Sequence, residues 1–207
     1  ATGPGRFAID FMPRFTGAGQ VSMTIRDAAG NARHVTRRFY ATPNLLRPGL
    51  DAWSVEVGAL RKDYGLRSFA YGSPFAGAVW RRGITPQLTL ESRIEASVTS
   101  AAQGVAASFA IPELGEFGMA AASQGPLGDG YLYKTSFQRR TPTYSIAVNY
   151  EHADAAFRQV GDDRPAQGAR SDLTFAGSMD MGRAGNFSLG YLTSRRGDDR
   201  VSIGSLA

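Results

Sequence analysis

The sequence of 207 residues has no cysteine, only two histidines, and no apolar run of the length that a membrane helix needs. The absence of cysteine excludes disulfides and thiolate-bound metals from this segment. His34 and His152 are far apart, and neither belongs to a cluster of Asp, Glu and His at metal-ligand spacing, so we predict no metal site. A membrane helix needs about 20 predominantly apolar residues, whereas a barrel strand crosses with about ten alternating ones. Helical spans are therefore excluded, but barrel strands are not.

Clustered positive charge is also lacking. The net charge of +5 comes almost wholly from arginine, and Lys62 and Lys134 are the only lysines. Nucleic-acid-binding domains gather basic residues on one face or helix, whereas these arginines are scattered, so we predict no nucleic-acid partner. The Gly-Asp-Asp-Arg sequences at 161–164 and 197–200 fit solvated loops better than a divalent-cation site. We predict no catalytic residue, no cofactor and no small-molecule substrate, and hence no enzyme.

What the sequence does contain is the alternation of apolar and polar residues. In residues 87–98, Leu88, Leu90 and Ile94 fall on one face of an extended chain, and the charged residues fall on the other. A helix would mix the two sets around its circumference, so the pattern predicts a strand. The same alternation recurs in several further segments: 53–59, 105–111, 131–138, 144–151, 173–181 and 187–191, with weaker strands at 68–80 and 115–123. With 25 glycines, this predicts an all-β protein with many turns.

The predicted connections alternate between short and generally longer. Short ones are expected at 81–86, 112–114, 140–142 and 182–184, and longer ones at 64–67, 99–104, 124–130, 153–170 and 197–200. Outer-membrane barrels have short periplasmic turns and longer outside loops, so the order predicts an up-and-down antiparallel transmembrane β-barrel segment. Aromatic residues near strand ends fit the girdles of such barrels: Trp80, Tyr131, Tyr133, Tyr144, Tyr150 and Tyr191.

The first forty residues differ from the rest. Short alternating runs flank a turn at 27–31 that is rich in glycine and asparagine, which is typical of a β-hairpin. Two prolines at 43 and 48 then interrupt any strand ladder. We predict part of a small β-sandwich at 1–43, a linker at 44–49 and barrel strands at 50–207. The predicted core residues of the sandwich are Phe7, Ile9, Val21, Met23, Ile25 and Phe39. No signal peptide opens the sequence, and we expect an internal piece of a longer protein.

Four motifs resemble the fimbrial outer-membrane ushers, in that family's order and spacing. Residues 4–11 (Pro-Gly-Arg-Phe-Ala-Ile-Asp-Phe) are similar to the family's Pro-Gly-Pro-Phe-x-Ile-x-Asp-Leu, and residues 19–30 resemble its next hairpin. Residues 45–58 carry Leu-Leu-Arg-Pro-Gly and then Trp-Ser-Val-Glu-Val-Gly, similar to Leu-Leu-Arg-x-Gly and Tyr-x-Leu-x-x-Gly. Residues 82–90 resemble the turn after the following strand. Beyond about residue 100 the likeness is one of pattern, and Arg6 stands where the family usually has proline.

The resemblance implies a function. Ushers are large outer-membrane barrels of Gram-negative bacteria with a β-sandwich plug inserted between two strands, so residues 1–43 would be the C-terminal part of the plug. The parent protein would secrete pilus subunits delivered by a periplasmic chaperone and would serve as the platform for pilus assembly. Its partners would be chaperone–subunit complexes and outer-membrane lipid. Assembly would proceed by donor-strand exchange between subunits, with no cofactor.

Glu91 and Glu95 form a pair of carboxylates, as a glycosidase requires. However, both lie on the polar face of one predicted strand with Arg93 between them, and in a barrel that face lines the lumen. We therefore predict pore lining instead of catalysis. The predicted pore-lining residues are Arg61, Glu91, Arg93, Glu95, Lys134 and Glu151.

Two other readings of the sequence stay open at this point. A porin or an autotransporter translocator would share the barrel, but a simple porin has no sandwich before a barrel strand. A soluble all-β binding module would have polar exterior faces, whereas here the apolar faces of successive strands need lipid or a large core.

Overall fold

The computed structural model describes residues 16–26, 32–61, 69, 71–98, 100–125, 130–158, 160 and 168–207. These residues are almost entirely β-structure, with a single 3₁₀ turn, η1 (Gly182–Ala184). The first two strands, β1 (Gly17–Arg26) and β2 (Ala32–Ala41), form a hairpin with a sheet of its own. The other ten strands form one sheet. No helix of the described residues is long and apolar enough to cross a membrane.

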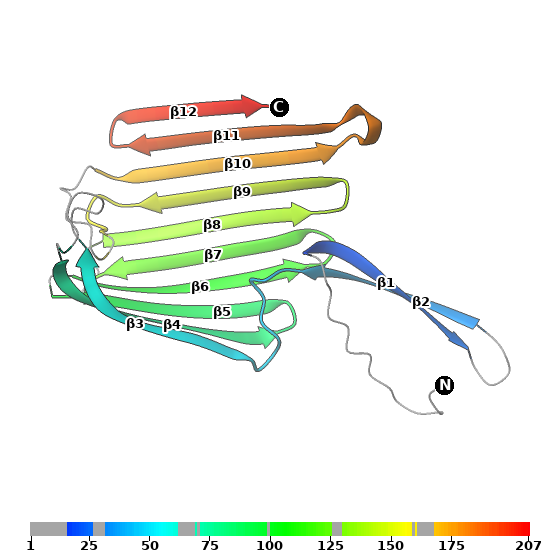
Figure 1. Cartoon of the computed structure of the whole chain (residues 1–207), viewed down its shortest axis with the longest axis horizontal. Coiled ribbons are helices and arrows are strands. Elements are labelled where there is room, and N and C mark those ends of the chain that lie inside the picture. The colour runs from blue at the N-terminus through cyan, green and yellow to red at the C-terminus, as the bar shows by residue number, and fades with distance from the viewer. Residues whose placement is uncertain are drawn as a thin grey trace.

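The large sheet is a simple meander. Its order is β12-β11-β10-β9-β8-β7-β6-β5-β4-β3, so each strand pairs antiparallel with its neighbours in the chain. The strands are β3 (Asp51–Arg61), β4 (Tyr71–Thr85), β5 (Leu88–Ser97), β6 (Ala101–Ile111), β7 (Gly115–Gln124), β8 (Gly130–Arg140), β9 (Tyr144–Ala153), β10 (Arg170–Asp180), β11 (Asn186–Arg196) and β12 (Asp199–Leu206). Figure 1 shows them stacked in chain order, with β3 and β12 as the two open edges. The predicted all-β antiparallel barrel segment is confirmed, and the sheet does not close on itself.

Strand register places the apolar residues of successive strands on one side. One cross-strand row runs from Val55 through Ala78 to Ile94, and another runs from Phe109 through Phe117 to Phe137. Because side chains alternate across a strand, every second residue of each strand shares this side, which we call the apolar face. Its members are widely exposed, as Val57 (81 %) and Trp53 (74 %) illustrate. The opposite side, which we call the polar face, carries most of the charged residues of the same strands.

The connections differ from the prediction at three places. The predicted longer loops at 99–104 and 197–200 are instead tight connections, because β6 already begins at Ala101 and the last hairpin turns at Gly197 and Asp198. The turn conformation of Gly197 (φ 56°) suits this two-residue connection. The predicted short turn at 81–86 also shrinks, since β4 continues through a bulge near Gly83 to Thr85. The longest connections between consecutive strands of the large sheet, at 62–70 and 154–169, lie at the end of the sheet where the longer loops are predicted.

Strand β12 has the opposite alternation to its neighbours. The tight turn pairs Arg196 with Asp199, and this register places Val201 and Ile203 on the polar face. Arg200 and Ser202 consequently lie on the apolar face, beside Arg195 and Thr193. A change of register by one residue exchanges all the side chains of a strand between faces, so the turn length sets which residues β12 presents to each side.

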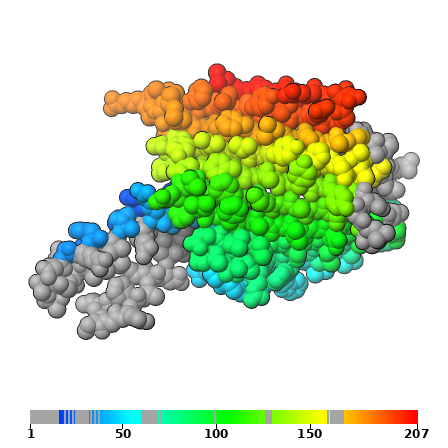
Figure 2. Space-filling view, turned by 180° about the vertical axis from the view of Figure 1, so that it is seen from behind, coloured from blue at the N-terminus to red at the C-terminus, as the bar shows by residue number. Residues whose placement is uncertain are grey.

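The hairpin β1–β2 leaves the sheet at the end where the short turns lie, and Figures 1 and 2 show it projecting from that end. Of the predicted sandwich core, Phe7 and Ile9 lie outside the described residues. Val21, Met23 and Ile25 belong to β1, but their side chains are outside the described part, and Phe39 on β2 is half-buried. The division into 1–43, 44–49 and 50–207 stays a prediction.

Candidate functional site: the polar face and the linker that crosses it

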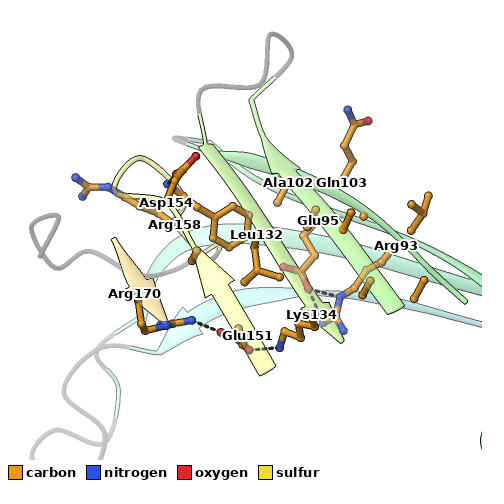
Figure 3. Close-up of a pocket in the computed structure, with 18 of the residues that line it drawn as sticks. Arg93, Glu95, Ala102, Gln103, Leu132, Lys134, Glu151, Asp154, Arg158 and Arg170 are labelled. Atoms are coloured by element: carbon orange, nitrogen blue, oxygen red, sulfur yellow. Dashed lines mark hydrogen bonds and ion pairs between the residues drawn. The ribbon is translucent and has the colours of Figure 1, made fainter. Parts of the chain in front are cut away.

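The polar face contains a hollow of about 420 Å³ near the end of the sheet with the long connections. Predicted pore-lining residues from three strands surround it: Glu91, Arg93 and Glu95 of β5, Lys134 of β8 and Glu151 of β9 (Figure 3). Arg61 lies on β3, and its side chain is outside the described part. The structure therefore brings five of the six residues to one hollow, although their role in lining a pore stays a prediction.

Charges on the β8–β10 side of the hollow are linked to one another. The carboxylate of Glu151 contacts Lys134 Nζ at 2.6 Å and also accepts a hydrogen bond from Arg170 Nη2. The Nε of Arg170 lies 3.4 Å from the carboxylate of Asp172 on the same strand. Figure 3 shows Glu151 between its two cationic partners. Arg170 was missed from the sequence, although continuing the β10 alternation of Leu173 and Phe175 backward would have placed it on the polar face.

The β4–β5 side has its own pairs. Arg93 donates from Nε to Glu95 at 2.6 Å, and Arg81 Nε lies 3.3 Å from Glu91. Lys134 and Arg93 keep more than half of their side-chain surface exposed. Exposed ion pairs of this kind contribute about 0–1 kcal/mol each, so these charges do little to hold the sheet together. Their physical effect is to keep the polar face hydrated.

The floor of the hollow is made of small residues. Strands β6 and β7 place Ala102, Gly104, Ala106, Ala120 and Ala122 between the two charged sides. Side chains of this size leave room above the sheet, so the hollow results from the contrast with the long charged residues on either side.

At the other end of the polar face, the chain crosses the sheet before it enters β3. Asn44 Nδ2 donates to Glu116 Oε1 at 2.6 Å, and the backbone N–H of Leu46 donates to Thr89 Oγ1 at 2.8 Å. Arg81 Nη2 donates to the carbonyl of Asn44 at 2.7 Å. We call this set of contacts the linker anchor.

The linker anchor buries polar groups. Thr89 is 2 % exposed and Glu116 is 4 % exposed, and the second carboxylate oxygen of Glu116 accepts from Gln138 Nε2 at 2.7 Å. Gly83 allows the backbone to approach, because a Cβ there would lie 2.1 Å from the carbonyl oxygen of Arg47. Backbone bonds between Gly49 and Gly83 and between Gly83 and Leu50 complete the crossing. Sequence reasoning did not predict this site.

The base of the hairpin is held at the same end. Tyr40 donates to the backbone carbonyl of Gln138 at 3.4 Å, and Arg38 contacts Glu113 at 2.9 Å. Burial raises the pKa of the Tyr40 phenol, and the nearby Glu116 carboxylate acts in the same direction. Gly17 lies against Arg140, whose carbonyl oxygen would be 2.7 Å from an added Cβ. The hairpin thus joins the sheet through its polar residues and a glycine contact.

The connection after β9 begins by folding over the other end of the polar face, where the hollow lies. Asp154 accepts hydrogen bonds from the backbone N–H of Tyr131 at 2.8 Å and of Phe157 at 2.7 Å. Phe157 consequently lies against Gly130, where an added Cβ would be 2.4 Å from the backbone nitrogen of Phe157. Phe157 and Asp154 both line the hollow. The connection therefore narrows the hollow from this end.

The described residues contain no group of three or more potential metal ligands. His34 pairs with Thr24 on the hairpin, and His152 pairs with Ser171 at 2.7 Å on the apolar face.

An up-and-down antiparallel sheet with one apolar and one polar face has the arrangement of a β-barrel wall. No protein-family model matches the sequence, and no curated protein matches it either. Among solved structures, the chain is similar to the translocation pore of the P pilus usher (PapC), with a TM-score of 0.61 and 14% sequence identity. The similarity covers 95% of this chain and 42% of that one, so the chain spans less than half of the pore. The chain therefore has an usher-like β-barrel fold, as the motifs predicted.

Proposed function

We propose that this chain forms part of the wall of an outer-membrane usher channel in a Gram-negative bacterium. The parent protein would secrete pilus subunits delivered by a periplasmic chaperone and would serve as the platform on which the pilus is assembled. The observation that supports this most directly is the apolar face, which spans strands β3 to β11 and leaves Trp53 and Val57 mostly exposed. Burying such a surface in lipid removes apolar area from water, which is favourable.

The polar face fits the lumen of such a channel. Charges of both signs surround the hollow, and the small residues of its floor leave space beside them. A wall kept hydrated by its charged groups would offer little adhesion to a folded subunit that passes along it. We propose that Glu91, Arg93, Glu95, Lys134 and Glu151 line this lumen, and that Arg61 joins them from β3. The proposed partners are chaperone–subunit complexes and outer-membrane lipid, and no cofactor takes part.

The linker anchor favours an usher over a simple porin. A segment that enters β3 from the polar face, after a separate hairpin, fits a domain inserted before a barrel strand and held on the luminal side. We propose that residues 1–43 are the C-terminal part of such a plug and that residues 44–49 connect it to the wall. A soluble binding module would leave the exposed apolar face without a partner.

Two measurements test the proposal. First, the full-length parent is produced with its own signal sequence, and Arg93→Cys and Ile94→Cys variants are treated with a water-soluble thiol reagent in outer membranes. The proposal expects heat-modifiable protein in the outer membrane, with labelling at position 93 and protection at position 94. Protein found soluble in the periplasm, or the reverse labelling, would contradict the barrel.

The second measurement concerns the transport role. Deleting the parent gene is expected to abolish surface pili while subunits accumulate with their chaperone in the periplasm. Normal pili in the deletion strain, together with a folded barrel in the wild type, would favour the porin or autotransporter alternative.

A further inference from the structure

One cross-strand row on the apolar face is polar and basic. Register aligns His152 of β9 with Ser171 of β10, Ser171 with Arg195 of β11, and Arg195 with Arg200 of β12. We call these four residues the basic row. The row exists because β12 has inverted alternation, which brings Arg200 to the face that otherwise carries apolar side chains.

The basic row lies next to aromatic residues on the same face. Tyr133 of β8 is in register with His152, and its ring lies 4.9 Å from the imidazole and 6.1 Å from the ring of Tyr150. Tyr191 lies on the same face of β11 as Arg195, with Thr193 between them on that face. Tyrosines occupy the headgroup level of outer-membrane barrels. The row, which lies on the loop side of Tyr150 and Tyr191, is therefore at or just beyond the headgroup level of the leaflet that the long connections face.

The two arginines lack anionic partners within the described part of the chain. Arg195 donates from Nε to the carbonyl of Gly197 at 3.3 Å, and Arg200 donates from Nε to the hydroxyl of Thr193 at 3.3 Å. The nearest acidic residues along these strands, Asp172 and Asp199, belong to the polar face. Like charges that are directly opposite on adjacent strands repel and destabilise the pair. An anion bound between the guanidinium groups would remove that cost.

We propose that the basic row binds the phosphate groups of the phosphorylated glycolipid of the outer leaflet, lipid A. Guanidinium groups bind phosphate oxygens in a bidentate manner and lose less hydration than ammonium groups do. The acyl chains of such a lipid would lie along the apolar residues beneath the row, Leu173 and Phe175 among them, so one molecule satisfies both parts of the surface. The inference rests on the proposed function, because it requires this face to meet the outer leaflet.

The test uses the full-length parent purified in detergent. Heat modifiability is measured first to establish that the barrel is folded, and binding of bisphosphorylated lipid A is then measured by native mass spectrometry. The double substitution removes both guanidinium–phosphate contacts, and charge-assisted hydrogen bonds of this kind are stronger than neutral ones. The Arg195→Gln/Arg200→Gln double variant is therefore expected to bind lipid A more than about tenfold more weakly.

Arg196→Gln is the matched control, because Arg196 is adjacent in sequence, belongs to the same turn and lies on the polar face. It should bind lipid A like the wild type, and the Arg195→Lys/Arg200→Lys variant should recover most of the affinity through its charge. Lipid A without phosphate should bind as weakly to the wild type as lipid A does to the glutamine variant.

Three outcomes would overturn the inference. Unchanged lipid A binding by a heat-modifiable double glutamine variant would show that the row takes no part in binding. Competition by inorganic phosphate at the same concentration as lipid A would show a simple anion site with no lipid specificity. A wild-type protein that is not heat-modifiable would refute the proposed function itself, and the inference with it.

Discussion

The two ends of the polar face use similar residues for different purposes. At the end with the short turns, Thr89 and Glu116 are almost completely buried, and each accepts hydrogen bonds from the segment that crosses the sheet. At the other end, Lys134 and Glu151 form an ion pair in which the lysine is 53% exposed. A buried polar group that loses its partner costs about 1–3 kcal/mol, whereas an exposed ion pair contributes about 0–1 kcal/mol. Burial, more than residue type, therefore distinguishes a site that holds the chain from a surface that stays hydrated.

The linker anchor should therefore be sensitive to substitution, whereas the hollow should tolerate it. Exchange of backbone amides with solvent reports on the linker anchor, because the N–H groups of Leu46 and Gly49 are both hydrogen-bonded to the sheet. The stability of the barrel and its ion selectivity report on the hollow.

The largest effect is expected for Gly83→Ala. The added Cβ would lie 2.1 Å from the carbonyl oxygen of Arg47, and the atoms that it would meet all belong to the backbone. Overpacking of this kind costs up to about 3 kcal/mol, so the crossing segment should separate from the sheet. Hydrogen exchange of a peptide that covers residues 44–50, measured by mass spectrometry on the full-length protein, should accelerate more than about tenfold.

Gly58→Ala is the control for this substitution. Gly58 lies on the polar side of β3, and an added Cβ would meet nothing within 4 Å. Its exchange in residues 44–50 should match the wild type. Equal exchange in the Gly83→Ala and Gly58→Ala proteins would mean that the segment does not depend on close contact with Gly83.

A smaller effect at the same end is expected for Glu116→Gln. The carboxylate accepts from the side-chain amides of Asn44 and Gln138 through separate oxygens. A glutamine has one accepting oxygen, so its own NH₂ group would face one of these donors. The cost of about 1–3 kcal/mol should increase exchange in residues 44–50 by less than Gly83→Ala does. Glu56→Gln, at an exposed position of β3, should leave exchange unchanged, and a similar response of both variants would argue against a specific role for Glu116.

The sequence predicted the strands better than the sites, for physical reasons. Alternation identified β5 because Leu90, Arg93 and Ile94 differ sharply in polarity. The start of β6 was predicted as a loop because Ala102 and Gly104 provide no such contrast, and the same small residues form the floor of the hollow.

The linker anchor could not be predicted for a different reason. Thr89 and Glu116 look like ordinary polar-face residues of a strand, and their burial comes from partners 43 and 72 positions away in the sequence. The inverted alternation of β12 likewise follows from the length of one turn, which the predicted longer loop at 197–200 did not specify.

The smallest effect on stability is expected for Glu151→Gln. The substitution removes the shared carboxylate between Lys134 and Arg170, but Arg170 keeps Asp172 nearby, and all of these side chains are partly hydrated. The unfolding free energy of the barrel should therefore change by less than about 1 kcal/mol.

The surface of the hollow becomes more positive by one charge, and at about 0.1 M salt that charge acts over about 10 Å. Openings of the proposed full-length channel in planar bilayers should consequently become more anion-selective, and more so at low salt. Asp51→Asn removes one carboxylate from the apolar side near Arg82 and should leave selectivity unchanged. A loss of several kcal/mol in the Glu151→Gln protein, with unaltered selectivity, would mean that the hollow is a structural site like the linker anchor and that the two ends of the polar face do not differ in the way proposed.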